Sequence, residues 1–354
     1  MNMNEGEGLN GNEHPGERVG VAVQELLQLL GRLSAESAAA LQWPQRLQAL
    51  QQRLSSLASR APDELLFVLI AGAGRLQPRY GLHHALATAA IVEQAGAVLG
   101  WPEHERRAVG LAALTMNLSI VELQDDLAHR ERTLTVEQRQ ALAAHPARSA
   151  ARLAELGVDD ALWLDTVAWH HQPPDASSAA QDGAERLAAL LRRVDVFLAK
   201  MSPRAARPGL PATQAARDAC LGADGRPDLF GAAILKTLGL YPPGSLVTLH
   251  GGETAVVWQR GARLEQPLVL AIAGADRQPY ARPLLRRTAE APPRDPRVGR
   301  PGRGAHPLGP AGPARRRPHD AALSVAAQPP PACDQPVTVT WHSTPPPAAS
   351  SQRT

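Results

Sequence analysis

Apolar residues recur every three or four positions through most of the first 240 residues, which predicts a succession of amphipathic helices. Residues 21–72 follow this spacing, as in the segment VAVQELLQLLGRL. Residues 80–99 predict a longer helix that Gly100 ends. Thr135 is placed to cap a helix that begins VEQRQALAAH. Further helices are expected at about residues 146–156, 159–171, 182–201, 212–221 and 227–239.

The pattern changes at Tyr241, where short runs of β-forming residues replace the helical spacing. The runs are YPPGSLVTL, ETAVVWQ and PLVLAIA, and the first two are separated by a turn signal at residues 250–252. They predict a small β-meander that ends near Pro283. The expected fold class is therefore mainly α: a helical bundle with a small β-meander at its C-terminal end and disordered termini.

Composition supports a helical core and argues against several classes of protein. Hydrophobic residues make up 44% of the chain and aromatic residues only 3%, so the core must consist mainly of Ala, Leu and Val. The net charge of +3 gives no sign of specific nucleic-acid binding. No signal peptide and no membrane span are expected. The two cysteines, Cys220 and Cys333, lack metal-ligand spacing, which fits a reducing, cytoplasmic location.

Shifts in composition divide the chain into five expected regions. The last region holds 15 of the 32 prolines, and it is expected to be disordered because it has little to bury. Alternatively, this tail is the product of a shifted reading frame. The regions are a disordered lead (1–19), an N-terminal helical segment (20–75), a helical domain (76–240), a small β-rich subdomain (241–287) and a disordered Pro/Arg/Ala-rich tail (288–354).

Five residues in the helical region have the chemistry of metal ligands: His84, His145, His170, His171 and Asp195. Imidazole and carboxylate groups bind divalent ions, and helices that present such groups inward can form a metal site. Asp195 lies among apolar residues, so its charge is expected to have a partner.

Each of these residues also has a plain structural interpretation. The histidines and the aspartate can form a hydrogen-bonded polar core that binds no metal. His145 can simply end a helix, because Pro146 follows it. A second acidic pair, Asp125 and Asp126, is interpreted as either metal-binding or, more simply, a solvated helix face.

The spacing of these residues resembles that of HD-GYP domains. That family has a helix histidine, an H-D-x-G-K motif about 32 residues later, a His-Pro about 29 residues further on, and then the motif HHERxDGxGYP. Here His84 is followed after 32 residues by Met116 and after 29 more by His145-Pro146. His170-His171 and Asp195 follow in order, and LTVEQRQALAAHP resembles the segment around the family's His-Pro. The resemblance covers about 200 residues, roughly 80–283.

The same alignment shows where this chain departs from the family. Met116 and Asn117 stand at the positions of the His-Asp pair, and Ile120 stands at the position of the motif lysine. In place of HHERxDGxGYP the chain has HHQPPDASSAA, which keeps only the two histidines and Asp175. No catalytic residue is therefore assigned.

The resemblance implies a bi- or trinuclear metal centre that activates water and holds a phosphate. The aspartate of the His-Asp pair would bridge two metals, and the neutral amide of Asn117 cannot supply that charge. A full multinuclear centre is not expected. The expected cofactor is either none or one divalent metal of the iron or manganese type, bound by some of the remnant ligands His84, His145, His170, His171 and Asp195.

The resemblance implies a link to cyclic di-GMP signalling in a bacterium. The first expectation is a non-catalytic signalling or binding module whose partner is a cyclic dinucleotide or a signalling protein. One alternative is a residual metal-dependent phosphohydrolase acting on cyclic di-GMP or another phosphodiester. Another is a structural, partner-docking protein without a ligand. The apolar helix faces at about residues 21–59 offer a surface for a homodimer or for docking.

Overall fold

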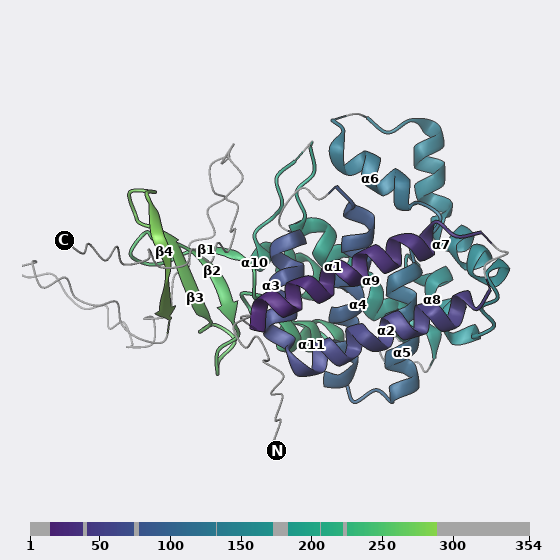
Figure 1. Cartoon of the computed structure of the whole chain (residues 1–354), viewed down its shortest axis with the longest axis horizontal. Coiled ribbons are helices and arrows are strands. Elements are labelled where there is room, and N and C mark those ends of the chain that lie inside the picture. Colours follow the sequence, from purple (N-terminus) through teal and green to yellow (C-terminus); the bar gives the residue numbers. More distant parts are fainter. Residues whose placement is uncertain are drawn as a thin grey trace, which may run out of the picture.

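A computed structural model of the chain describes residues 15–37, 41–73, 78–131, 133–172, 183–205, 207–221 and 225–288. Over these residues, a helical body is followed by a small antiparallel sheet at one end (Figure 1), which confirms the expected fold class. No helix in the described part of the chain combines the length and apolar character needed to cross a bilayer. The helices are α1 (Pro15–Ser34), α2 (Trp43–Arg60), α3 (Pro62–Ala73), α4 (Tyr80–Val98), α5 (Glu103–Thr115), α6 (Val121–His129), α7 (Val136–Glu155), α8 (Ala161–Trp169), α9 (Ala184–Met201), α10 (Ala212–Cys220) and α11 (Leu229–Leu238).

The helix α4 is the centre of the body. It packs against α3, α5, α9 and α11, and almost all of its residues are buried. Alanines such as Ala85, Ala89 and Ala90 line its surface, and their small side chains let neighbouring helices approach closely. Because α4 carries His84, the packing that builds the core also places this histidine inside the bundle.

The N-terminal helices α1, α2 and α3 cover α4 and α5. α1 begins at Pro15, a few residues before the helical segment expected from residue 20. Its apolar positions, such as Leu26 and Leu30, are buried in the main core. The indole of Trp43 at the start of α2 donates a 2.9 Å hydrogen bond to the carbonyl of Leu33, which ties α2 to the end of α1.

Two helices differ from the expected boundaries. Residues 121–129, to which the sequence assigned no helix of its own, form α6, which is amphipathic but buries only Ala128 fully. α7 continues through Pro146 as one helix of 20 residues, so the expectation of a break at His145-Pro146 is wrong. A capping box between Thr135 and Gln138 starts α7, as the sequence predicted for Thr135.

The sheet is a four-stranded meander with the order β1-β2-β3-β4, all neighbours antiparallel. Its buried residues, among them Val257 and Val269, form a small separate core with Tyr241. β2 packs on α3, where the rings of Phe67 and Trp258 lie 5.0 Å apart. Sequence reasoning predicted three strands and missed the fourth. The strands are β1 (Leu246–Thr248), β2 (Thr254–Gln259), β3 (Leu268–Ala273) and β4 (Pro279–Arg287).

A buried glutamate lies where α2, α4 and α5 meet. The side chain of Gln51 donates a 2.8 Å hydrogen bond to Glu93, which is only 7% exposed. The carboxylate lies so close to Gly110 that a side chain there would clash with it. Burial raises the pKa of Glu93 from 4.5 to about 7, and the hydrogen bond from Gln51 offsets only part of this effect.

We predict that Glu93→Gln stabilises the protein at pH 8 and much less at pH 5. The folded-state pKa is raised, so folded Glu93 stays protonated between pH 4.5 and 7 while the unfolded chain ionises. Stability attributable to this residue is therefore lost as the pH rises through that window. Urea unfolding at both pH values should show a difference on the order of 2–3 kcal/mol. The exposed Glu185→Gln should show almost none, and equal effects in the two variants would contradict the prediction.

Candidate metal centre

Three histidines from two helices converge at one place in the bundle. His145 comes from α7, while His170 and His171 directly follow α8. Each offers one ligand atom, and these atoms all lie within 4.8 Å of one another. Because α8 ends at Trp169, the two adjacent imidazoles do not diverge as they would within a helix, and their centroids lie 4.2 Å apart. His170 is fully buried and His171 is exposed, so the cluster is open to solvent on one side.

Pro146 fixes the orientation of the neighbouring His145 ring. A residue at this position of a helix would normally donate its backbone N–H to the carbonyl of Leu142, but proline has no N–H. The Nδ1 atom of His145 donates to that carbonyl instead, at 2.6 Å. The His-Pro pair is therefore a local device that orients the imidazole, and it leaves Nε2 facing the site.

The ring of His170 is oriented in a similar way. Its Nδ1 atom donates to the carbonyl of Val167 at 2.7 Å. The helix that precedes it is anchored at Trp163, whose indole donates a 2.9 Å hydrogen bond to Thr115 on α5. Asp160 caps the start of this helix by accepting from the backbone N–H of Trp163. As a result, the Nε2 atoms of His170 and His145 lie 3.2 Å apart.

Burial keeps these imidazoles in the form that binds metals. It lowers the pKa of His170 to about 3 and also lowers the pKa of His145 below the usual value of 6.5. Both rings are therefore neutral at physiological pH, and a neutral imidazole is the form that binds a metal ion.

His84 and Asp195 form a hydrogen-bonded pair beside the three histidines. The Nε2 atom of His84 donates to the Asp195 carboxylate at 2.7 Å, which joins α4 to α9. Burial raises the pKa of Asp195, but the hydrogen bond from His84 and attraction to imidazoles, including those of His170 and His171, outweigh it and lower the pKa to about 2. The partner expected for Asp195 is therefore present. The Nδ1 atom of His84 is buried and has no hydrogen-bond partner among the residues that the structure describes.

A tyrosine and an arginine line the site on the side of His84. The ring of Tyr80 stacks on His84 with centroids 5.6 Å apart, and the guanidinium of Arg204 lies 5.3 Å over that tyrosine ring. Arg204 also donates a 3.4 Å hydrogen bond to the Tyr80 hydroxyl. Sequence reasoning missed Arg204, because it lies in the loop after α9 and belongs to no spacing pattern that singles it out.

The positions that correspond to the family's His-Asp pair follow α5. Met116 is fully buried as part of the main apolar core, and Asn117 and Ile120 are also buried. A thioether and an alkyl chain stabilise this region by packing, and neither supplies a charge. The adjoining Ser119 hydroxyl contacts Ser149 at 3.0 Å and the carbonyl of His145 at 3.2 Å, so this segment is tied directly to α7.

The two carboxylates of the acidic pair in α6 have separate protein partners. Asp125 accepts a 2.7 Å hydrogen bond from the backbone N–H of Gly81, so it caps the first turn of α4. Asp126 pairs with Arg130 one turn later at 2.5 Å. Asp125 therefore helps to hold the start of the helix that carries His84. Asp175 and the rest of the expected substrate loop lie in residues 173–182, outside the described residues.

The donor set fits one metal ion better than a bridged cluster. Three imidazole nitrogens converge, which suits a single divalent ion with an open position. The nearby carboxylate of Asp195 is engaged by His84. Two cations a few ångströms apart need a bridging anion between them, and Asn117 is neutral at the corresponding position. The residues that would hold a metal are thus His145, His170 and His171, with His84 and Asp195 beside them.

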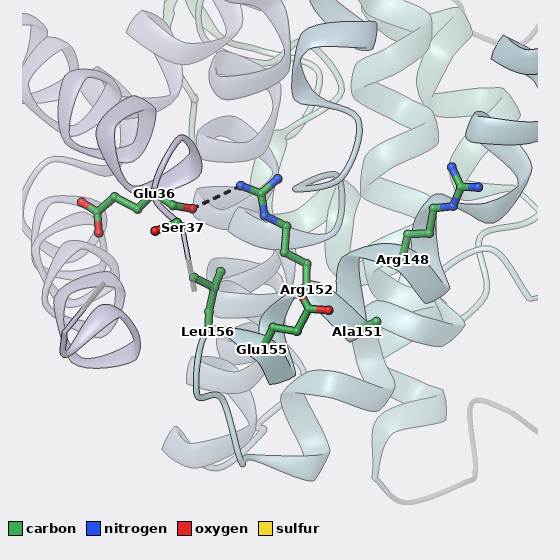
Figure 2. A pocket seen from close by; sticks show the side chains of 7 residues that line it. All are labelled: Glu36, Ser37, Arg148, Ala151, Arg152, Glu155 and Leu156. Carbon is green, nitrogen blue, oxygen red and sulfur yellow. Dashed lines mark hydrogen bonds between the residues drawn. The ribbon is translucent and has the colours of Figure 1, made fainter. Parts of the chain in front are cut away.

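A separate pocket of about 500 Å³ lies between the end of α1 and the C-terminal half of α7 (Figure 2). No histidine lines it. The guanidinium of Arg152 reaches toward the connection after α1 and donates to the carbonyl of Glu36 at 3.4 Å (Figure 2). It also donates to the carbonyl of Ser34 at 2.9 Å. These contacts anchor α7 to the N-terminal helices. The lining residues are Glu36, Ser37, Arg148, Ala151, Arg152, Glu155 and Leu156.

The sequence resemblance implies an HD-type fold. The helical bundle agrees with it, because His84 and Asp195 meet from different helices. The chain is similar to a curated cyclic di-GMP phosphodiesterase of Pseudomonas aeruginosa, with 27% identity over 219 residues, or 60% of this chain. The chain spans about half the length of this relative, 52%. The similarity supports a place in the HD superfamily. No family model matches the chain, and no solved structure matches it.

We predict that Asp195→Ala destabilises the metal-free protein by about 1–3 kcal/mol, because it leaves the buried Nε2 of His84 without an acceptor. Urea unfolding in the presence of a chelator measures this loss. Asp126→Ala removes an exposed pair with Arg130 and should cost less than about 0.5 kcal/mol. If the two variants lose the same stability, the His84–Asp195 bond does not hold the helices as described.

Proposed function

We propose that this chain is a non-catalytic signalling module related to cyclic di-GMP phosphodiesterases, which binds its ligand without hydrolysing it. The observation that carries the proposal is the filling of the family's His-Asp positions by the buried Met116 and Asn117. Of the other candidate ligands, three histidines form a cluster, and His84 forms a hydrogen-bonded pair with Asp195. The scaffold is thus retained while the charge that a bridged metal centre needs is absent.

Absence of the metal-bridging aspartate affects hydrolysis of a phosphodiester more than it affects binding of the ligand. Hydrolysis of a phosphodiester needs an activated water, and a metal centre supplies it when bound. Without a carboxylate at position 117, the chain has no group there to hold a second cation or to orient that water. Ile120 also removes the cation that the family motif places near the phosphate. These losses act on the transition state, so the expected turnover is very low.

Arg204 provides a charge that suits phosphate binding. Its guanidinium lies 5.3 Å from the centre of the Tyr80 ring, which itself stacks on His84. Guanidinium groups bind phosphate oxygens in a fork geometry. Tyr80 is only 4% exposed, so the charge of Arg204 alone supports binding of a phosphorylated ligand. Cyclic di-GMP is the substrate named for the relative, and it is the ligand proposed here. The proposal places the protein in the cytoplasm.

A residual metal-dependent phosphohydrolase is the second candidate, favoured by the open side of the histidine cluster at His171. One divalent ion, of the iron or manganese type by the resemblance, would then act alone.

A third candidate is a structural protein that only docks to a partner. A homodimer through residues 21–59 remains a prediction. It would use exposed side chains such as Val21, which is 61% exposed, because Leu26 and Leu30 are buried within the chain.

We predict that the purified protein binds cyclic di-GMP but does not hydrolyse it with added manganese or iron. Calorimetry measures binding, and chromatography of the nucleotide products measures turnover. Arg204→Ala should weaken binding by about tenfold or more, the effect of losing a charge-assisted hydrogen bond. Arg107→Ala, which removes an exposed arginine on α5 outside this cluster, should leave binding unchanged.

Two outcomes would contradict this proposal. Turnover that disappears in His170→Ala would show a working phosphohydrolase and favour the second candidate. Absence of both heat and thermal shift with cyclic di-GMP would favour the structural protein.

Restoring the family's His-Asp pair tests whether its absence limits metal binding. The double variant Met116→His with Asn117→Asp should bind more metal per chain than the parent. Its unfolding must be measured alongside, because Met116 lies in the core.

A further inference from the structure

A row of apolar side chains crosses the sheet on the face opposite to its small core. The strand register places Leu246 beside Val256, Val256 beside Leu270, and Leu270 beside Leu285. The row therefore includes one residue from each of the four strands. Neighbouring residues of a strand point to opposite faces, so the row lies on the face opposite to the buried Val257.

The apolar row is exposed to solvent in the part of the chain that the structure describes. Leu246 is 58% exposed and Leu285 is 53% exposed, while Val256 and Leu270 are half-buried. None of the four belongs to either hydrophobic core. The sheet extends from one end of the helical body, with β4 farthest from the helices (Figure 1). A contiguous apolar patch of this kind commonly marks a surface that another segment or molecule covers.

The outer edge of β4 is poorly suited to accept a further strand. Pro279 and Pro283 lie in β4, and neither has a backbone N–H to donate. Proline in an edge strand is a common means of preventing the addition of another strand. The surface that remains available for contact is therefore the apolar face and not the edge.

The size of this face argues against a second copy of the chain as its occupant. β2 and β3 each have six residues. With four strands, the face measures roughly 15 Å by 20 Å, or about 300 Å². A stable interface between separate chains buries about 800 Å² on each partner. A segment of the same chain can bind through a smaller area, because its tether gives it an effective concentration of about millimolar.

The sequence after β4 contains a segment of matching chemistry. Residues 289–354 follow β4 and lie outside the described residues. They include one run of β-forming residues, VTVTW at positions 337–341. In an extended backbone the two valines and Trp341 share one side, and the two threonines share the other. About 50 residues connect this run to β4, and a flexible chain of that length spans about 35–40 Å, more than the width of the sheet.

We propose that residues 337–341 cover the apolar row of the sheet within the same chain. The side that carries the two valines and Trp341 contacts the row, and the two threonines face solvent. Burial of apolar surface on both partners provides the driving force. The alternation of apolar and polar residues in VTVTW suits a segment with one buried and one solvated side. This inference concerns the sheet and does not depend on the proposed function.

Spin labelling of the full-length chain tests the inference. A nitroxide is attached at Thr338→Cys, on the solvent side of the segment, in a chain that also carries Cys333→Ser. The remaining Cys220 is buried, and burial raises its thiol pKa to about 11, so the label reacts at one site. We expect the electron paramagnetic resonance spectrum to show restricted motion that does not depend on protein concentration.

Two matched pairs of variants locate the contact. Leu285→Asp should release the label into fast motion. Leu284→Asp should leave it restricted, because Leu284 pairs with Ala271 on the opposite face of the sheet. Within the segment, Val339→Asp should release the label and Thr340→Asp should not. Hydrogen exchange of β2 and β3 shows whether each variant keeps the sheet, and the second pair leaves the sheet residues unaltered.

Three outcomes would overturn the inference. The first is fast motion of the label in the parent chain. The second is restricted motion that persists in both Leu285→Asp and Val339→Asp. The third is restriction that appears only at high protein concentration together with a dimer in sedimentation, which would assign the face to a second copy.

Discussion

The hydrogen bond between His84 and Asp195 is the interaction on which the rest of the site depends. It joins α4, the central helix, to α9, and it gives the partly buried carboxylate of Asp195 its partner. The nearby imidazoles of His170 and His171 also help to lower the pKa of Asp195. Tyr80 stacks on His84, and the guanidinium of Arg204 lies over the Tyr80 ring. A single hydrogen bond inside the bundle is therefore linked to both the polar core and Arg204.

Backbone carbonyl groups fix the orientation of two rings in the histidine cluster. Pro146 frees the carbonyl of Leu142, which then holds the ring of His145, and the end of α8 holds the ring of His170 in the same manner. Both rings are thus aimed at one point before any ligand arrives. Local hydrogen bonds therefore hold the two buried rings of the three-imidazole arrangement without any contribution from Asn117.

The helical part of the fold was largely predictable, because the apolar spacing of helices such as α2 and α9 directly reflects their burial. The strand β4 was not, since most of its residues are exposed and PYARPLLRR shows no clean alternation. The site residues could be proposed from their order along the chain. The sequence could not predict that these residues divide into a three-histidine cluster and a His84–Asp195 pair, because this division depends on how the imidazole rings are oriented. The role of Asp125 as a cap for α4 and the position of Arg204 over Tyr80 are contacts between distant segments that no local pattern encodes.

The central claim is that the histidine cluster of this bundle is a site for one metal ion and not for a bridged pair. Anomalous X-ray diffraction from crystals grown with Zn²⁺ tests it most directly, because it locates each bound metal independently of activity. The account predicts a single anomalous peak within bonding distance of His145, His170 and His171, with Asn117 uncoordinated. Two peaks a few ångströms apart, with Asn117 or Asp195 between them, would contradict it.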